Sequence, residues 1–293
     1  MGIVLGPNQY GKAENRLVRI YRDGPRHEIR DLNVSTSLRG DFADAHLAGD
    51  QSAVLPTDTQ RNTVFAFAKE HGVGPIEDYG LTLARHFVAD VEPVHGARVE
   101  IEEYAWDRID DHDHAFVRRG QEIRTVAVTL DGDDGGRAYV VSGLKDLTVL
   151  KSTGSEFRGF LHDRYTTLAE TTDRILATSL EVRWLHIGEP EAWDVSYASV
   201  RGLLLDRFAQ VHSKALQQTL WEMGKAVLEA HAGIAEIRLT APNKHHFAVD
   251  LAPFELDNPN EVFFAADRPY GVISASVVRE GAQEAGLAWS AGA

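Results

Sequence analysis

The sequence predicts an α+β protein whose mainly antiparallel sheets carry paired helices on one face. Strand-like segments, in which apolar and polar residues alternate, stand before and after two consecutive helical segments, and this order occurs twice along the chain. Consecutive helices between groups of strands favour antiparallel sheets, because parallel strands need a long crossover connection at every step. The recurrence predicts a duplicated structural unit.

The first half of the chain provides three strands and one pair of helices. Alternating apolar residues predict strands at 16–21, 98–104 and 125–130, each buried on one face. Helices are predicted at 58–71 and 75–90, because apolar residues recur on one helical face and glycines separate the two segments. The helix pair is expected to cover one face of the sheet that the strands form.

The second half follows the same order after a glycine-rich turn at 131–136. Its predicted elements are a strand at 138–150, a further segment at 173–184, helices with apolar stripes at 197–211 and 216–227, and strands at 236–240, 247–251 and 272–278. We therefore predict one domain at residues 1–135, a second at 136–280 and a flexible tail at 281–293. Sheets with open edges favour closure into a barrel on oligomerisation.

Charge and composition narrow the class of function. The chain has 30 basic and 44 acidic residues, a formal net charge of -14, which disfavours a nucleic-acid partner because that partner needs a basic surface. It has 43% apolar and 25% charged residues and no apolar run long enough to cross a membrane, as in soluble globular proteins. The N-terminal residues lack a secretory signal pattern, so a cytoplasmic location is predicted.

The chain contains no cysteine, which excludes disulfides, thiolate catalysis and Cys-ligated metal centres. Asp-His-Asp-His at 111–114 is the candidate metal site, because His112 and His114 on a strand would face the same way beside carboxylates. No third ligand stands at a recognisable spacing. A hydrogen-bonded loop is therefore the favoured interpretation, and a metal site is the alternative.

The run Pro-Asn-Lys-His-His-Phe at 242–247 places polar and ionisable side chains inside a strand-like segment. Because side chains alternate along a strand, Asn243 and His245 are expected to point one way, and Lys244 and His246 the other. This spacing offers a hydrogen-bond donor and a proton carrier on one rigid element. The alternative is a polar strand end at a sheet edge.

Other candidate residues have ordinary structural interpretations when each is taken singly. Lys12 follows a glycine in the first strand region, and Thr57, before Asp58, fits a helix N-cap whose hydroxyl accepts a free backbone N–H. Arg174 fits a surface cation, and Gln217 fits a solvated helix residue. No hydrolase elbow, dinucleotide turn or Walker loop is present to assign another chemistry.

Six segments carry a resemblance to a known family. They are Asn-Gln-Tyr-Gly-Lys at 8–12, Leu-Arg-Gly-Asp-Phe at 38–42, Thr-Asp-Thr-Gln-Arg-Asn-Thr-Val at 57–64, Lys-Ser-Thr-Gly-Ser-Glu-Phe at 151–157, Tyr-Thr-Thr-Leu at 165–168 and Pro-Asn-Lys-His at 242–245. In order, and over nearly the whole chain, they resemble urate oxidase (uricase) of the bacterial type. Six separate matches make the resemblance specific.

The resemblance implies a tunnelling fold (T-fold), with two tandem domains per chain. It also implies dimers that close an antiparallel barrel, a homotetramer of two stacked barrels, and active sites at subunit interfaces. The implied reaction belongs to purine catabolism: O2 and water oxidise urate to 5-hydroxyisourate and hydrogen peroxide, with neither a metal nor an organic cofactor.

The same resemblance implies the substrate-binding residues. Arg174 and Gln217 resemble the pair that grips urate edge-on, and Phe157 resembles the ring on which the purine stacks. A guanidinium fork suits a planar anion, an amide suits a donor–acceptor edge, and a phenyl face supports a flat ring. Leu216 stands where the family offers a backbone N–H to the substrate, and Asn243 resembles the amide that holds O2 or the attacking water.

Lys12, Thr57 and His245 resemble the proton-relay triad of the family, in which the neighbouring subunit supplies Thr57 and Asp58. A lysine base near neutral pH requires desolvation, so Lys12 is expected to be shielded from water. The segment around His112 also resembles a family segment, and we assign it a structural role.

Two alternatives remain open at this point. Another tunnelling-fold enzyme that acts on a purine or pterin would also need an Arg and a stacking ring, although a cyclohydrolase of that group would need cysteine ligands that the chain lacks. The second alternative is a catalytically silent, purine-binding T-fold protein.

Overall fold

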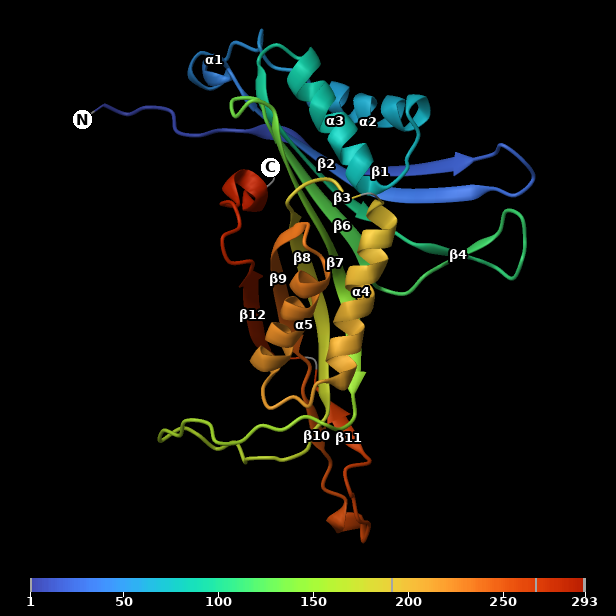
Figure 1. The fold of residues 1–293 in the computed structure, drawn as a ribbon, viewed down its shortest axis with the longest axis vertical. Coiled ribbons are helices and arrows are strands. Elements are labelled where there is room, and N and C mark those ends of the chain that lie inside the picture. Colours follow the sequence, from blue (N-terminus) through green and yellow to red (C-terminus); the bar gives the residue numbers. More distant parts are fainter. Residues whose placement is uncertain (1, 191, 267, 292–293) are drawn as a thin grey trace. The chain divides into compact units, whose positions relative to one another are not determined.

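The computed structural model describes residues 2–190, 192–266 and 268–291. The chain divides into two compact units (Figure 1): unit 1 comprises residues 1–143, 185–194 and 283–293, and unit 2 comprises residues 144–184 and 195–282. The division falls inside a long strand, β7 (Arg137–Lys151), and not at the turn at 131–136. The glycine-rich sequence therefore marks the turn that precedes β7 rather than the division between the units.

Unit 1 contains antiparallel strands and a helix pair. Besides the start of β7, its elements are β1 (Tyr10–Tyr21), β2 (Glu28–Gly40), α1 (Ala43–Leu47), α2 (Thr57–Glu70), α3 (Ile76–Asp90), β3 (Val94–Glu103), β4 (Trp106–Arg108), β5 (Phe116–Arg118), β6 (Ile123–Asp131) and the 3-10 helix η2 (Gly286–Trp289). β1 pairs with β2, β2 with β3, and β3 with β6, all antiparallel. α2 and α3 pack on one face of these strands (Figure 1).

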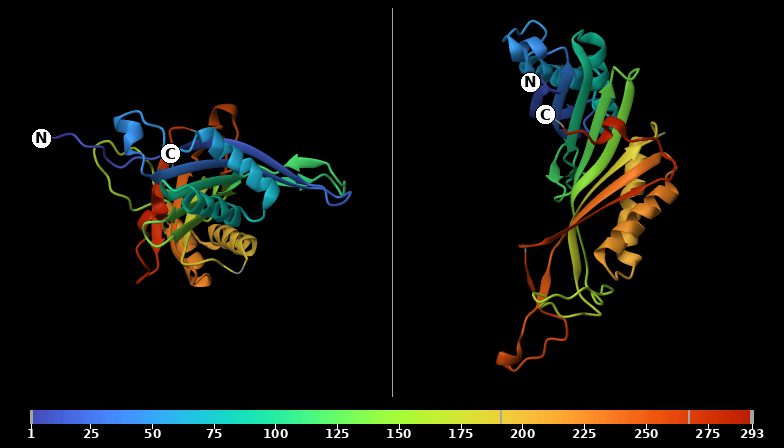
Figure 2. Two further views of the ribbon diagram at one scale, coloured as in Figure 1. Left: turned by 90° about the horizontal axis from the view of Figure 1, so that it is seen from above. Right: turned by 90° about the vertical axis from the view of Figure 1, so that its left-hand side faces the viewer.

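Apart from the short α1 and the small two-stranded sheets, unit 2 repeats the order of unit 1, with two strands, two helices and two strands. After β7, its elements are β8 (Leu176–His186), α4 (Trp193–Gln210), α5 (Leu216–Ala230), β9 (Ile234–Asn243), β10 (His246–Ala248), the 3-10 helix η1 (Ala252–Phe254), β11 (Phe263–Ala265) and β12 (Gly271–Val278). α4 and α5 lie on the same face of the unit 2 strands in both views of Figure 2. The hydrogen-bonded strand order is β1-β2-β3-β6-β7-β8-β9-β12, so β1 and β12 are its terminal strands.

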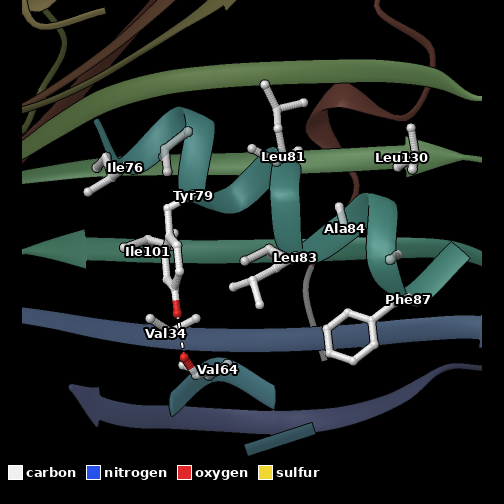
Figure 3. Packing of buried hydrophobic residues seen from close by; sticks show 14 of the residues in the cluster. Val34, Val64, Ile76, Tyr79, Leu81, Leu83, Ala84, Phe87, Ile101 and Leu130 are labelled. Atoms are coloured by element: carbon white, nitrogen blue, oxygen red, sulfur yellow. Dashed lines mark hydrogen bonds between the residues drawn. The ribbon is translucent and has the colours of Figure 1, made fainter. Parts of the chain in front are cut away.

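The core of unit 1 lies between the helix pair and the strands (Figure 3). Ile76, Leu83 and Phe87 are fully buried, because they recur on the face of α3 that meets the sheet. Tyr79 donates its hydroxyl to the Val64 carbonyl of α2 at 2.5 Å, and burial raises the pKa of this Tyr79 phenol. The two helices are thus joined by a buried polar contact as well as by apolar packing.

The core of unit 2 is built in the same way from α5 and the strands beneath it. Leu220, Met223 and Val227 recur on one face of α5 and are fully buried. They belong to one apolar cluster with Ile237 and Leu239, which alternate along β9 and project to the same face of the strand. In each unit, the apolar face of a helix therefore packs on the apolar face of the strands.

A glycine allows the second helix of each pair to approach its strands closely. A Cβ atom added at Gly80 of α3 would lie 2.9 Å from Cγ2 of Val128 in β6. A Cβ atom added at Gly224 of α5 would lie 2.6 Å from Cγ2 of Val277 in β12. Both distances are shorter than a carbon–carbon van der Waals contact, so the helices pack at a separation that only glycine permits.

The helices predicted at 58–71 and 75–90 are confirmed as α2 and α3, and both predicted stripes of the second half lie on α4 and α5. The sequence did not predict β2, because its buried face includes polar residues. Thr36 lies on the same face as the buried Leu32, Val34 and Leu38, is 2% exposed and donates its hydroxyl to Gln60 Oε1 at 2.8 Å. A buried polar residue with a partner interrupts the apolar alternation that marks an ordinary strand.

The strand-like interpretation of 242–247 does not hold over the whole run. β9 ends at Asn243, β10 begins at His246, and the two residues between them leave the strand conformation. The Lys244 N–H donates to the Ala177 carbonyl of β8 at 2.9 Å, and the His245 carbonyl accepts the Ala266 N–H at 2.9 Å. These bonds to other segments turn the backbone at the break.

The segment 281–293, predicted as a flexible tail, contains η2, which packs against unit 1. Ala288 is 1% exposed, and its carbonyl accepts a hydrogen bond from Nη1 of the buried Arg98 at 3.3 Å. The described part of this segment is therefore docked, because a buried guanidinium needs acceptors. Residues 292–293 lie outside the described residues.

None of the helices in the parts of the chain that the structure describes combines the length and the apolar character that crossing a membrane requires.

Candidate active site

The segment before β8 brings Phe157 and Arg174 into contact. Cζ of Arg174 lies 5.1 Å from the centre of the Phe157 ring. Phe157 exchanges two backbone hydrogen bonds with Thr171, at 2.9 and 3.0 Å, which close the loop between them. The Arg174 N–H donates to the Ser155 carbonyl at 2.8 Å, and Arg174 Nε lies 3.4 Å from Ser155 Oγ. The fully buried Ser155 thus holds the cation beside the ring.

Arg174 is half-buried, and no carboxylate among the described residues forms an ion pair with it. Burial lowers the pKa of Arg174, because desolvation disfavours the charged form. A guanidinium still keeps its proton at neutral pH. A partly desolvated cation without a protein carboxylate attracts an anionic ligand, and the adjacent ring offers that ligand a flat surface.

Ser213 joins this loop to α5, whose first two residues are Leu216 and Gln217. Ser213 forms a parallel backbone bridge with Ser155, and its hydroxyl accepts a hydrogen bond from Thr219 Oγ1 of α5 at 2.8 Å. The side chain of Leu216 is buried, whereas that of Gln217 is exposed. No side chain caps the start of α5, so its first backbone N–H groups can meet a ligand.

Asn243 and His245 lie at the end of unit 2 from which Arg174 projects. The hydrogen bond from the Lys244 N–H to the Ala177 carbonyl joins this segment to the start of β8. Arg174 stands just before that start. The three polar side chains are thereby placed on neighbouring strand ends.

The unit 2 residues form a set that suits a flat, anionic heterocycle. This site set comprises Phe157, Arg174, Leu216, Gln217, Asn243 and His245. It offers a stacking face, a fork of donors, a backbone N–H, two primary amides and an imidazole. Such a set can bind an anion edge-on and move a proton at its ring.

Lys12 and Thr57 both belong to unit 1, on β1 and at the start of α2. Lys12 of β1 pairs directly with Thr36 of β2, and opposite residues of an antiparallel pair project to the same face. Thr36 Oγ1 donates to Gln60 Oε1 of α2 at 2.8 Å, so α2 covers this face. Gln60 stands about one helical turn after Thr57. The topology therefore directs the Lys12 side chain toward the first turn of α2.

Two further contacts fix the same corner of unit 1. The Tyr10 hydroxyl donates to the Leu55 carbonyl, just before α2, at 3.0 Å. A Cβ atom added at Gly11 would lie 1.8 Å from the Thr36 carbonyl oxygen, so only glycine lets β1 approach β2 this closely. Lys12 itself is half-buried.

The interpretation of Thr57 as a helix N-cap is wrong. Pro56 occupies the N-cap position, and Thr57 is the first residue of α2, with no side-chain hydrogen bond capping the helix. Proline there sets the backbone angle that starts the helix, and the Thr57 hydroxyl is not used for capping. Asp58 is exposed and pairs with Arg61 at 2.5 Å on the same helix.

The loop between β4 and β5 holds His112 and His114, whose ring centres lie 4.5 Å apart with nearly perpendicular planes. Arg108 donates to the His112 carbonyl at 2.8 Å, and Arg26 pairs with Asp111 at 2.8 Å. Hydrogen bonds and an ion pair therefore hold this loop. Within residues 2–190, 192–266 and 268–291, no three His, Asp or Glu side chains are arranged to hold a metal ion.

Sequence reasoning missed the buried polar residues that hold the site residues in place. These supporting residues are Thr36, Gln60, Ser155, Ser213 and Thr219. Gln60 and Ser155 lie inside recognised segments, so they could have been found as polar residues that need buried partners. Ser213 and Thr219 carry no such signal, because their role arises from contacts between distant segments.

Comparison with known proteins identifies the family. The family model described as Uricase matches residues 8–129 and 140–274. A uricase from Arthrobacter globiformis is 55% identical over 98% of this chain and 94% of its own length, and one from Dictyostelium discoideum is 35% identical over 93% and 96%. The crystal structure of uricase from Arthrobacter globiformis superposes with a TM-score of 0.93 over 97% of this chain and 98% of that chain. The chain belongs to the uricase family.

Proposed function

We propose that the chain catalyses the oxidation of urate by O2 and water to 5-hydroxyisourate and hydrogen peroxide, as a step of purine catabolism. Membership of the uricase family supports the reaction. The observation that supports binding of a flat anion is the half-buried Arg174, whose guanidinium lies 5.1 Å from the Phe157 ring centre. A chain with a net charge of -14 needs such a local cation to bind an anion.

In this proposal the substrate binds as a flat anion. Arg174 donates two parallel hydrogen bonds to one edge of urate, and the Gln217 amide pairs with a donor–acceptor edge. The ring stacks on Phe157, and the backbone N–H of Leu216, at the uncapped start of α5, donates to a urate oxygen or nitrogen. Asn243 holds O2, and later the attacking water, beside the ring.

The proposed chemistry requires no metal or organic cofactor, because the urate anion supplies both electrons. Urate gives up two electrons and two protons, and O2 takes up both pairs to become hydrogen peroxide. Lys12 accepts a proton through the Thr57 hydroxyl. Water then adds across the oxidised ring by forming one carbon–oxygen bond, and His245 carries its proton.

We extend the proposal to the assembly. Each unit has the order of two strands, two helices and two strands, which supports two tandem T-fold domains. β1 and β12 end the strand order, and Val272 and Val278 of β12 are 61% and 57% exposed. Terminal strands with exposed apolar residues favour pairing with a second copy, so we propose dimers that close a barrel and pack as a homotetramer.

The arrangement of unit 1 refines the proposed subunit sharing. The pairing of Lys12 with Thr36, and the hydrogen bond from Thr36 to Gln60 in the first turns of α2, support a relay in which Lys12 and Thr57 come from one chain. A neighbouring subunit that supplies Thr57 and Asp58 to a pocket therefore supplies its own Lys12 as well. Arg174 and His245 of the first chain complete the pocket in this proposal.

The test is an assay of the purified protein with urate in air. We expect the ultraviolet absorption of urate to disappear while one equivalent of hydrogen peroxide forms, equally well with and without EDTA. Loss of activity with EDTA would contradict the cofactor-free mechanism and favour a metal at the His112–His114 loop.

Urate binding without oxidation would instead favour the catalytically silent purine-binding protein. Anaerobic titration with urate separates these outcomes, because a silent protein binds urate but leaves its absorption unchanged after air is admitted. The cytoplasmic location stays a prediction from the sequence.

A further inference from the structure

Phe157 is the first of three stacked rings. The proposed reaction gives no role to the other two, Phe160 and His162. The centres of the Phe157 and Phe160 rings lie 4.7 Å apart, with planes inclined by 14°. The Phe160 and His162 rings follow, with centres 4.8 Å apart and planes inclined by 20°. Ring separations and angles of this kind are those of offset stacking, which is favourable beyond the burial of apolar area.

The backbone of the loop is built to form this stack. Gly159 has a φ of +70°, a conformation that glycine adopts readily, and it turns the chain so that Phe160 folds back onto Phe157. The Gly159 N–H donates to Glu170 Oε1 at 2.8 Å, and the same oxygen lies 4.0 Å from His162 Nε2. One carboxylate therefore holds the turn and faces the outer end of the stack.

The loop is also tied at the end that carries the site. The two backbone hydrogen bonds between Phe157 and Thr171 close it, and Glu170 is the neighbour of Thr171. The turn, the carboxylate and the strand-like bridge thus act on the same short segment. Phe157 is only half-buried, so without these contacts its ring could adopt other rotamers.

We propose that Phe160, supported by His162, is a positioning residue that covers one face of Phe157 and so fixes the orientation of the ring on which the flat purine substrate stacks. A phenyl ring has two faces, and a substrate held edge-on by Arg174 can use only one of them productively. This inference rests on the proposed function. It adds that the ring behind Phe157 fixes the plane in which the substrate lies.

The test compares Phe160→Ala, Phe160→Leu and Phe160→Tyr with the unchanged chain. We expect Phe160→Ala to weaken anaerobic urate binding and raise KM by about three- to tenfold, with kcat changed by less than about twofold, since the lost stacking acts on binding. Phe160→Tyr is expected to bind urate as the unchanged chain does, because it keeps the ring. Phe160→Leu keeps apolar volume without a ring, and its affinity for urate is expected to lie between those of Phe160→Ala and Phe160→Tyr.

Phe254→Ala is the matched control, because Phe254 is 70% exposed on another loop of unit 2 and belongs to no ring stack in the described residues. It is expected to leave urate binding unchanged. Melting temperatures of all variants show whether each is folded, and Phe160→Leu and Phe160→Tyr keep the test valid if Phe160→Ala unfolds.

Three results would overturn the inference. Unchanged binding in Phe160→Ala would mean that Phe160 does not orient Phe157. Equal loss in Phe160→Tyr and Phe160→Ala would mean that stacking is not the cause. Tighter binding in Phe160→Ala would mean that Phe160 occupies the substrate face. If the unchanged chain neither binds nor oxidises urate, the proposed function fails instead, which distinguishes the two failures.

Discussion

Arg174 is a cation of unit 2 whose charge no carboxylate among the described residues compensates. It is half-buried, it lies against an aromatic face, and burial lowers its pKa without a carboxylate among the described residues to offset the desolvation. Keeping a cation in such a place costs free energy unless a ligand supplies the opposite charge. Arg174 therefore lowers the stability of the ligand-free protein and favours the binding of an anion.

We expect Arg174→Ala to weaken urate binding by about 1.5–3 kcal/mol, the contribution of hydrogen bonds to a charged group. Arg174→Lys keeps the charge but loses the paired donors, and we expect it to recover only part of the affinity. Anaerobic titration with urate measures both. Full recovery by lysine would show that charge alone, and not the guanidinium fork, binds the substrate.

Glu77 of unit 1 is a buried carboxylate that lies outside the proposed site. It is 0% exposed, lies 2.7 Å from Arg124, and accepts a hydrogen bond from Ser142 Oγ at 2.8 Å. Burial raises the pKa of Glu77, and the charge of Arg124 opposes that rise only in part. The ion pair fixes the start of α3, but it does not fully offset the cost of burying the ionised Glu77 carboxylate.

The contribution of Glu77 to stability is expected to fall as pH rises above 4.5, the ordinary pKa of a glutamate, because burial raises the pKa of Glu77 in the folded state. Because its pKa is raised in the folded state, the folded state binds more protons than the unfolded state in that window, and each added pH unit lowers the free energy of unfolding. Glu77→Gln removes this slope. Urea unfolding of both proteins at several pH values measures it, and parallel profiles would contradict the assignment.

Glu77→Ala tests the pair itself. We expect a loss of about 3–5 kcal/mol in the free energy of unfolding, because Arg124 loses its most deeply buried counter-charge and the Ser142 hydroxyl loses its acceptor. Arg124 also contacts Asp194 at 2.6 Å and lies 3.8 Å from Glu103, so a smaller loss would show that these carboxylates compensate for Glu77.

At the scale of the elements, close contact between helix and strand distinguishes α5 from α4. A Cβ atom at Gly224 of α5 would meet Val277 at 2.6 Å, whereas one at Gly202 of α4 would meet nothing within 4 Å. Both residues stand inside helices, where glycine is less favourable than alanine. The same substitution is therefore expected to have opposite effects at the two positions.

We expect Gly224→Ala to lower the free energy of unfolding by about 1–3 kcal/mol through overpacking. The matched control, Gly202→Ala, is expected to raise it by about 0.4–1 kcal/mol, since alanine restricts the unfolded chain without a clash. Denaturant unfolding of the two variants measures both. Equal shifts of one sign would mean that helix propensity outweighs packing at Gly224.

The elements also show what the sequence could and could not predict. Helices α2 to α5 were predictable because their apolar residues recur with the helical period, and β3, β6 and β12 because theirs alternate. β2 was missed because Thr36, a polar residue bonded to Gln60, interrupts the apolar series of its buried face. The break after Asn243 was missed because a hydrogen bond to β8, distant in sequence, sets it.

The candidate site was predictable only in part for the same reason. The side chains that would touch the substrate stand in recognisable segments, but their placement depends on the contacts of buried Ser155, Ser213 and Gln60 with distant partners. A hydroxyl or amide in a sequence does not reveal which distant group it will meet. The sequence therefore indicates which residue types are available for a site, and only the folded structure shows how they are placed.

At the scale of the whole molecule, the proposed pocket needs residues from two chains, which a mixing experiment can test. Lys12→Met and Arg174→Ala are each expected to abolish most of the activity. If one subunit supplies Lys12 with Thr57 and another supplies Arg174, co-expression of the two variants restores some pockets with every residue intact. Random pairing across a two-fold interface predicts recovery of about a quarter of the activity.

The matched control mixes Lys12→Met with Thr57→Ala. If one chain supplies both residues, as the Lys12–Thr36 pairing and the Thr36–Gln60 hydrogen bond support, every relay in this mixture carries one defect, and no recovery is expected. Recovery in the control would mean that Lys12 and Thr57 come from different chains. Failure of the first mixture to recover, with normal assembly by mass, would mean that each pocket is built from one chain or that Lys12 is not the base.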